Sequence, residues 1–159
     1  MTKRIRTGLE CLIDDPPDFL KNKRIGLLCN PASVHSGFSH ALDLTAQRLP
    51  GQLTALFSPQ HGFYAEKQDN MIESDHFVEP RYDIPVYSLY GETRIPTTEM
   101  FDGIDVLIVD IQDVGTRVYT FIYTVSYCLE TAAAMNKKVV ILDRPNPIGG
   151  TQVEGNILS

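Results

Sequence analysis

Five short apolar runs recur along the chain, and each ends in a polar loop that contains glycine or proline. Within each run nearly every position is apolar, whereas a strand with one wet face would alternate. Continuous runs of this kind are typical of strands that are buried on both faces of a sheet. The runs cover residues 24–29, 53–57, 85–89, 105–109 and 138–142. We therefore expect a sheet of about five strands.

Stretches with helical periodicity lie between these runs. Apolar residues recur at a spacing close to 3.6 within 37–49 and within 119–136, which predicts two amphipathic helices. A shorter helix is expected within 9–20, and another is expected to be capped by one of the threonines at 97–98. Strands that alternate with helices imply right-handed crossovers, so we expect an α/β fold with a mostly parallel sheet.

Two segments do not follow this rhythm. Residues 62–83 are polar and mixed, and a loop of about twenty residues in a compact domain usually carries function or unrecognised structure. After Leu142 the chain reads DRPNPIGGTQVEGNILS, in the manner of a sixth element that is beginning. We therefore expect residues 1–159 to be one domain of a longer protein that lacks its C-terminal domain here.

Composition narrows the class of protein. The chain has 159 residues, 43% hydrophobic and 21% charged, so it can bury a core and is not expected to be disordered. Fourteen basic and twenty acidic residues give a formal charge of -6 without a basic cluster, so we expect no nucleic-acid or membrane partner. The N-terminus lacks the apolar segment of a signal peptide, and the expected compartment is the cytoplasm. Cys11, Cys29 and Cys128 are far apart in the sequence, so we expect buried, reduced thiols.

Polar side chains are concentrated in the loops that follow the predicted strands. Because the carboxyl ends of parallel strands meet at one edge of a sheet, these side chains are expected to converge on a single small-molecule site. The residues concerned are Asn30, His61, Glu92, Asp110, Asp113, Arg117, Asp143, Arg144 and Asn146.

Several common kinds of site are disfavoured. The segment after the first run reads NPASVHSG, which has neither the glycine pattern of a dinucleotide site nor a P-loop. The four histidines lack the spacing of metal ligands, and no G-x-S-x-G elbow occurs. A hard cation on Asp110, Asp113 and Asp143 is a weaker alternative. We expect neither a cofactor nor a metal ion.

Carboxylates are the remaining candidates for chemistry. Asp110 and Asp113 stand three residues apart at the end of the most hydrophobic run, Glu92 follows Gly91, and Glu66 lies in the long polar segment. A protonated and an ionised carboxyl group on either side of a glycosidic oxygen are what sugar hydrolysis requires. The simpler interpretation of any one of these acids is a turn or a cap.

The loop sequences resemble those of the exo-β-N-acetylmuramidase family, which was long catalogued as a domain of unknown function. The segments that carry the resemblance are LLCNPASV, FSPQHGFYAEKQDNM, VYSLYGETRIPT, VDIQDVGTRVYTFI and ILDRPNPIGGTQVEG, from about Gly8 to Gly155. The resemblance implies a Rossmann-like, three-layer N-terminal domain, followed by a second domain of comparable size. It also implies release of terminal N-acetylmuramic acid from peptidoglycan fragments in cell-wall turnover and recycling.

The resemblance and the loop positions together identify the expected substrate contacts. These are Asn30, Gln60, His61, Tyr90, Gln112, Arg117, Tyr119, Asp143, Arg144, Asn146 and Glu154. One departure matters, because many members read Ser-Pro-Glu-His-Gly where this chain has Gln60. A glutamine cannot exchange a proton as a catalytic acid does. If that glutamate is the acid of the family, another group takes its place here, or the chain acts differently.

We therefore expect an exo-acting glycosidase whose substrate is a muropeptide or amino sugar. Glu92 or Glu66 would protonate the leaving oxygen, while Asp110 or Asp113 would act as the base or stabilise the oxocarbenium-like transition state. A further group would bind the lactyl carboxylate that distinguishes muramic acid from glucosamine, and Arg117 and Arg144 are the candidates for it. The alternative is a non-catalytic module that binds muropeptides, which Gln60 favours.

Overall fold

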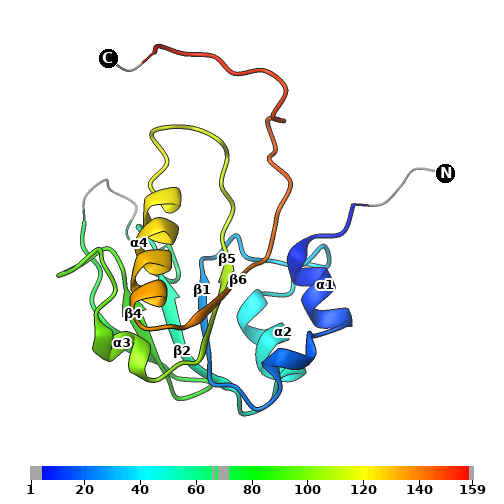
Figure 1. Cartoon of the computed structure of the whole chain (residues 1–159), viewed down its shortest axis with the longest axis vertical. Coiled ribbons are helices and arrows are strands. Elements are labelled where there is room, and N and C mark those ends of the chain that lie inside the picture. Colours follow the sequence, from blue (N-terminus) through cyan, green and yellow to red (C-terminus); the bar gives the residue numbers. More distant parts are fainter. Residues whose placement is uncertain (1–4, 66, 68–71, 158–159) are drawn as a thin grey trace.

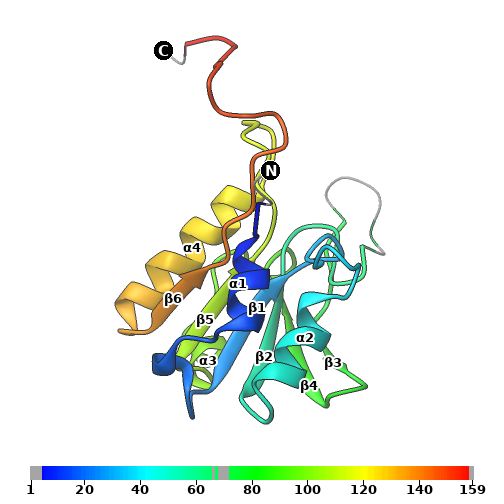
Figure 2. The same cartoon turned by 90° about the vertical axis from the view of Figure 1, so that its right-hand side faces the viewer.

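A computed structural model describes residues 5–65, 67 and 72–157, and it contains a six-stranded sheet with helices on both faces (Figures 1 and 2). The strands are β1 (Ile25–Cys29), β2 (Leu53–Ser58), β3 (Phe77–Glu79), β4 (Ile84–Ser88), β5 (Val106–Asp110) and β6 (Lys138–Ile141). Their order in the sheet is β3-β4-β2-β1-β5-β6, and every neighbouring pair is parallel except β3 and β4. The predicted α/β class with a mostly parallel sheet is confirmed.

The helices form the two outer layers. They are α1 (Gly8–Asp14), α2 (Ala41–Arg48), α3 (Thr98–Asp102) and α4 (Phe121–Ala134), with a short 3-10 turn at Asp18–Leu20. Residues of α1 and α2 pack with one face of the sheet, and residues of α3 and α4 pack with the other, as Figure 2 shows. In the described part of the chain, no helix combines the length and the apolar character needed to cross a membrane.

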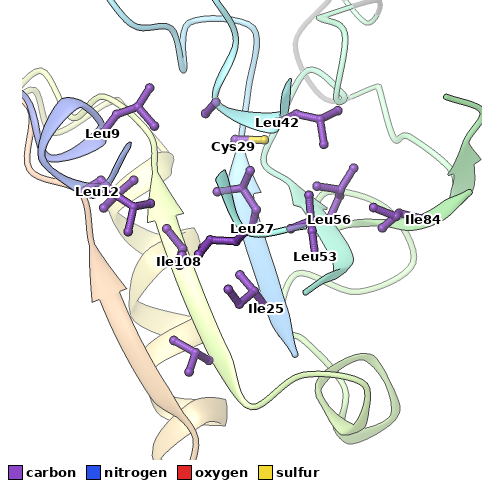
Figure 3. Packing of buried hydrophobic residues seen from close by; sticks show 14 of the residues in the cluster. Leu9, Leu12, Ile25, Leu27, Cys29, Leu42, Leu53, Leu56, Ile84 and Ile108 are labelled. Carbon is purple, nitrogen blue, oxygen red and sulfur yellow. The ribbon is translucent and has the colours of Figure 1, made fainter. Parts of the chain in front are cut away.

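The strands are apolar throughout because each supplies both faces of the core. In β1, Ile25, Leu27 and Cys29 pack on the side of α1 and α2 (Figure 3), whereas Leu28 packs on the side of α3 and α4. This alternation is the two-residue period of a strand with two buried faces. Gly26 faces the side of α3 and α4, where a Cβ atom would come within 2.9 Å of the Phe57 ring.

Most predicted elements are present with small shifts at their ends. The helix expected within 37–49 begins only at Ala41, because Phe38 has a φ of 64° and is exposed, and His40 accepts the amide of Leu42 as N-cap. The helix expected within 9–20 ends at Asp14, ahead of two prolines that cannot continue it. Thr97 caps α3, as expected.

The polar segment 62–83 carries the kind of unrecognised structure that its length suggested, namely the edge strand β3, which pairs antiparallel with β4 and brings the sheet to six strands. One expectation was wrong. Cys11 is exposed, because α1 turns this position away from the sheet, whereas Cys29 and Cys128 are buried as expected. Burial raises the pKa of Cys128 to about 12, and burial followed by the nearby Asp110 carboxylate raises the pKa of Cys29 well above its usual value. Both buried thiols therefore stay protonated.

One buried ion pair joins three loops at the carboxyl edge of the sheet. Asp110, the last residue of β5, is fully buried and accepts two hydrogen bonds from Arg144, at 2.6 and 2.9 Å. The same guanidinium donates to the carbonyl of Val34 at 3.1 Å, and the Ser33 hydroxyl donates to the Asp110 carbonyl. The bidentate, charge-assisted contact between Arg144 and Asp110 thus fixes the loops after β1, β5 and β6 relative to one another.

A second ion pair lies at the opposite edge of the sheet. Arg24 donates its backbone amide and its guanidinium to the Asp105 carboxylate, with distances of 2.9 and 2.7 Å. These hydrogen bonds from Arg24 lower the pKa of Asp105 from 3.8 to about 2. The pair of Arg24 and Asp105 therefore stabilises the turn before β5 at every pH at which Asp105 is ionised.

We expect Arg144→Met to lower the free energy of unfolding by about 3–5 kcal/mol, because it leaves the buried Asp110 carboxylate unpaired. The measurement is urea unfolding followed by circular dichroism. The double variant Asp110→Asn/Arg144→Met should recover part of the loss. Arg6→Met, which breaks the exposed pair with Asp14, is the control and should cost less than about 1 kcal/mol. Equal losses for Arg144→Met and Arg6→Met would contradict this assignment.

The lowered pKa of Asp105 predicts a pH dependence of stability. Because the pKa is lower in the folded chain than in the unfolded chain, the stabilisation is complete above pH 3.8 and is lost as the pH falls towards 2. We expect Asp105→Asn to flatten the dependence of the unfolding free energy on pH within that window. The exposed Asp15→Asn serves as control and should leave the slope as in the wild type. Parallel curves for the wild type and Asp105→Asn would refute the prediction.

Candidate functional site

A cavity of about 490 Å³ lies at the carboxyl edge of the sheet, where the loops after β1, β2 and β5 meet. In Figure 1 the carboxyl edge is the upper end of the sheet, where the arrowhead of β5 points. The residues that line it are Asn30, Pro31, Ala32, Gln60, His61, Gly62, Ala65, Lys67, Gln112, Val114, Tyr119 and Phe121. Loops that leave three parallel strands thus meet at this cavity, and of the nine loop residues expected to converge, Asn30 and His61 line it.

The loop after β1 presents an amide to the cavity. Asn30 is buried, and its side-chain oxygen accepts the amide of Ala32 at 3.0 Å in a tight turn. Its carbonyl accepts a hydrogen bond from the ring of His40 at 2.9 Å. The Asn30 Nδ2 has no protein partner among the described residues, so its two hydrogens are available to a ligand.

The loop after β2 presents a histidine held in one tautomer. The Nδ1 of His61 lies 3.0 Å from the carbonyl of Lys67, which can only accept, so Nδ1 carries the proton and the neutral ring has its lone pair at Nε2. The amide of Lys67 donates back to the carbonyl of His61 at 3.2 Å. His61 has a φ of 79° and Gly62 a φ of 81°, which is the sharp turn that bends the loop over the cavity.

A buried carboxylate on β3 accepts a hydrogen bond from this loop. Glu79 of β3 is fully buried and accepts hydrogen bonds from Arg81 and Tyr82 of the turn, and from the hydroxyl of Tyr64 at 3.2 Å. Burial alone would raise the pKa of Glu79, but the hydrogen bonds from Arg81 and Tyr82 outweigh burial and lower it. Because Tyr64 lies between the cavity residues Gly62 and Ala65 in sequence, this contact ties their loop to the β3–β4 hairpin.

The loop after β5 completes the wall with an amide and two aromatic rings. The amide nitrogen of Gln112 donates to the carbonyls of Asp113 and Pro145 at 2.8 and 3.1 Å, which leaves its oxygen free to accept. The rings of Tyr119 and Phe121 pack edge to face with their centres 5.4 Å apart. Gln60 accepts the hydroxyl of Thr120 at 2.7 Å, so the loops after β2 and β5 are joined across the cavity.

The structure brings together five of the predicted site residues. Asn30, Gln60, His61, Gln112 and Tyr119 all line the 490 Å³ cavity. Sequence reasoning did not single out Lys67, Phe121 or Thr120 as site residues. The only signals were the place of Lys67 in the long polar segment and the place of Thr120 and Phe121 at the start of the helix predicted within 119–136, and these do not distinguish a lining residue from a solvated one.

Other predicted site residues line two neighbouring hollows. Asp113, Asp143 and Asn146 lie around a hollow of about 400 Å³ beside α4. Arg117 and Glu154, with Asn146 again, line a wider hollow of about 920 Å³ between the loop after β5 and the C-terminal segment. Arg117 donates to the carbonyl of Asn156 there, at 3.2 Å. Figures 1 and 2 show this loop and the C-terminal segment extending beyond the same edge of the sheet.

The three predicted acids that the structure describes, Glu92, Asp110 and Asp113, do not line the main cavity. Asp110 is occupied by Arg144, which is itself only 9% exposed, so neither charge is free at the surface. Glu92 is exposed in the loop after β4, where neither it nor the buried Tyr90 lines the cavity. Glu66 lies outside the described residues. Among the residues that the structure describes, no carboxylate lines the 490 Å³ cavity.

The described residues contain no cluster of three histidine, cysteine, aspartate or glutamate side chains that could hold a metal ion. The cation alternative needed Asp110, and its carboxylate is already bound by Arg144.

Comparisons with known proteins agree with the fold and with the loop sequences. Residues 25–159 match the family described as "Exo-beta-N-acetylmuramidase NamZ, N-terminal". Over 155 residues, 98% of this chain, the sequence is 44% identical to the peptidoglycan β-N-acetylmuramidase NamZ of Bacillus subtilis strain 168. The chain spans 37% of the length of that curated relative.

Two solved structures of DUF1343 family proteins from Bacteroides fragilis NCTC 9343 have the same fold. The first superposes with a TM-score of 0.86 at 41% identity, over 98% of this chain and 38% of the other. The second has a TM-score of 0.69 at 34% identity, over 89% of this chain and 35% of the other. The chain therefore belongs to the family of exo-β-N-acetylmuramidase NamZ N-terminal domains.

Proposed function

We propose that this chain is part of an exo-acting glycosidase that releases terminal N-acetylmuramic acid from peptidoglycan fragments during cell-wall turnover. The observation that carries the proposal is the 44% identity, over 98% of the chain, to a relative named as a peptidoglycan β-N-acetylmuramidase. In this proposal the chain contributes the cavity that holds the terminal sugar.

The chemistry of the cavity suits an amino sugar. A volume of about 490 Å³ lies within the range of small-molecule sites. The Asn30 amide offers donors, while the Gln112 oxygen and the His61 Nε2 offer acceptors, which together match hydroxyl and acetamido groups. Tyr119 supplies an aromatic surface at the wall for the apolar side of a sugar ring.

The acid that protonates the leaving oxygen is proposed to come from the rim. Glycoside hydrolysis uses two carboxyl groups on either side of the scissile bond. Glu92 follows β4 at the same edge of the sheet, and Glu66 stands in the sequence between Ala65 and Lys67, which both line the cavity. Asp110 acts in this scheme through Arg144, as a positioning residue for the surrounding loops.

The second candidate function is a non-catalytic module that binds muropeptides. Two observations favour it, namely Gln60 in the place of a glutamate and a cavity without a carboxylate among its described lining residues. Such a module would bind the sugar through the same amides and the same histidine, but would not hydrolyse the glycosidic bond.

A chromogenic N-acetylmuramic acid glycoside tests the proposed activity in the protein that carries this chain. We expect turnover that falls by about 100-fold or more in Glu92→Gln or in Glu66→Gln, because removal of a general acid costs roughly 10²–10⁴-fold. Glu130→Gln on the exposed side of α4 is the matched control and should turn over like the wild type. Undiminished turnover in both test variants would place the acid elsewhere.

Gln60→Glu distinguishes the enzyme from the binding module. The hydroxyl of Thr120 already donates to the Gln60 side-chain oxygen at 2.7 Å, so a carboxylate has a partner in the same place. If the chain is a binding module because of Gln60, the variant should gain hydrolysis of the glycoside. If the wild type is already active through another acid, Gln60→Glu should change kcat by less than the loss seen for that acid. Inactive wild-type and Gln60→Glu proteins that both bind N-acetylmuramic acid would favour the module.

A further inference from the structure

The main cavity contains a single full charge among its described lining residues, and that charge is positive. Lys67 supplies it, while the other lining side chains are apolar, amide, phenol or imidazole groups. The chain as a whole carries a formal charge of -6, so the one charge among the described lining residues is opposite in sign to the net charge of the protein. A cavity of this kind favours an anionic ligand group.

The backbone of Lys67 is fixed at the cavity. Its carbonyl accepts the Nδ1 hydrogen of His61 and its amide donates to the carbonyl of His61, at 3.0 and 3.2 Å. In the segment between His61 and Lys67, the amide of Ala65 donates to the carbonyl of Gly62 at 3.3 Å. The ammonium group makes no hydrogen bond or ion pair with any described residue, so its three donors are available to a ligand. Fixing the root of a long side chain lowers the entropy cost of placing its charge.

The two arginines expected to bind a carboxylate are engaged elsewhere. Arg144 is neutralised by the buried Asp110 and also donates to the carbonyl of Val34. Arg117 lies outside the main cavity, in the hollow beside the C-terminal segment, where it donates to the carbonyl of Asn156. Neither arginine lines the cavity that contains Asn30 and His61.

We infer that Lys67 is the specificity-determining residue of this site and that it binds the carboxylate of the lactyl ether on N-acetylmuramic acid. N-acetylglucosamine lacks this ether, so the charge of Lys67 favours the first sugar over the second. The inference rests on the proposed function for the identity of the sugar. It adds the residue that recognises the acidic substituent, and replaces Arg117 and Arg144 in that role.

The test compares two chromogenic substrates, the β-glycosides of N-acetylmuramic acid and of N-acetylglucosamine, in the protein that carries this chain. We expect Lys67→Met to lower kcat/KM for the muramic acid glycoside by about 10- to 100-fold, the range of a charge-assisted hydrogen bond. The loss should be mainly in KM, and kcat/KM for the glucosamine glycoside should stay the same. Lys67→Arg should keep most of the preference, and Lys23→Met, at the opposite edge of the sheet, should keep all of it.

Salt supplies a second readout, because a partly exposed ion pair is screened while hydrogen bonds between neutral groups are not. Raising the ionic strength from about 0.01 to 0.5 M should weaken use of the muramic acid glycoside by the wild type and much less by Lys67→Met. Equal losses for both glycosides in Lys67→Met would overturn the inference, as would a preference abolished by Arg117→Met instead.

The failure of the proposed activity and the failure of this inference give different results. A wild-type protein that hydrolyses neither glycoside refutes the activity, and calorimetric binding of the two free sugars then decides the inference. Tighter binding of N-acetylmuramic acid that is lost in Lys67→Met supports it. Binding of both sugars with equal affinity, or of neither sugar, overturns it.

Discussion

The carboxyl edge of the sheet depends on the pair formed by Asp110 and Arg144. Removing two charges from water is costly, and the two hydrogen bonds between them offset that cost only while both partners are present. Since the guanidinium also holds the carbonyl of Val34, the pair sets the spacing of the loops that follow β1, β5 and β6. The position of Asn30 in the cavity wall follows from that spacing, because Asn30 begins the loop in which Ser33 contacts Asp110. A charged pair at the end of strands therefore acts as part of the scaffold.

The central strands were predictable because their chemistry is uniform. A strand that contributes Leu27 to one core and Leu28 to the other must be apolar at every position, and few other structures need that pattern. The edge strand β3 was not predictable in this way. It has three residues, one of them exposed and one the buried charge of Glu79. Its place depends on hydrogen bonds from Arg81, Tyr82 and Tyr64, which hydrophobic periodicity does not record.

The candidate site was predictable only as far as topology determines it. The rule that ligands bind beyond the carboxyl ends of parallel strands locates Asn30, His61 and Gln112 at one cavity, since each follows its strand within a few residues. The rule does not say which charged residues pair with each other. From the sequence, Arg144 and Arg117 are equivalent candidates for binding an anion, and only the fold shows that the first has a buried carboxylate as partner. Lys67 is nine residues beyond β2, where topology no longer determines the direction of the chain.

The charged groups in and around the cavity suggest that different residues bind the sugar and protonate its glycosidic oxygen. The described lining residues contain donors, acceptors and one cation, but no carboxyl group, and the Nδ1 hydrogen of His61 points to the carbonyl of Lys67. A carboxylate beside Lys67 would neutralise the ammonium and weaken its interaction with an acidic sugar. In the proposed scheme, Glu92 on the loop after β4 avoids that conflict, because it does not line the wall that contains Lys67. The glutamine at position 60 is consistent with the same constraint, since it keeps the hydrogen bond to Thr120 and adds no negative charge to the wall.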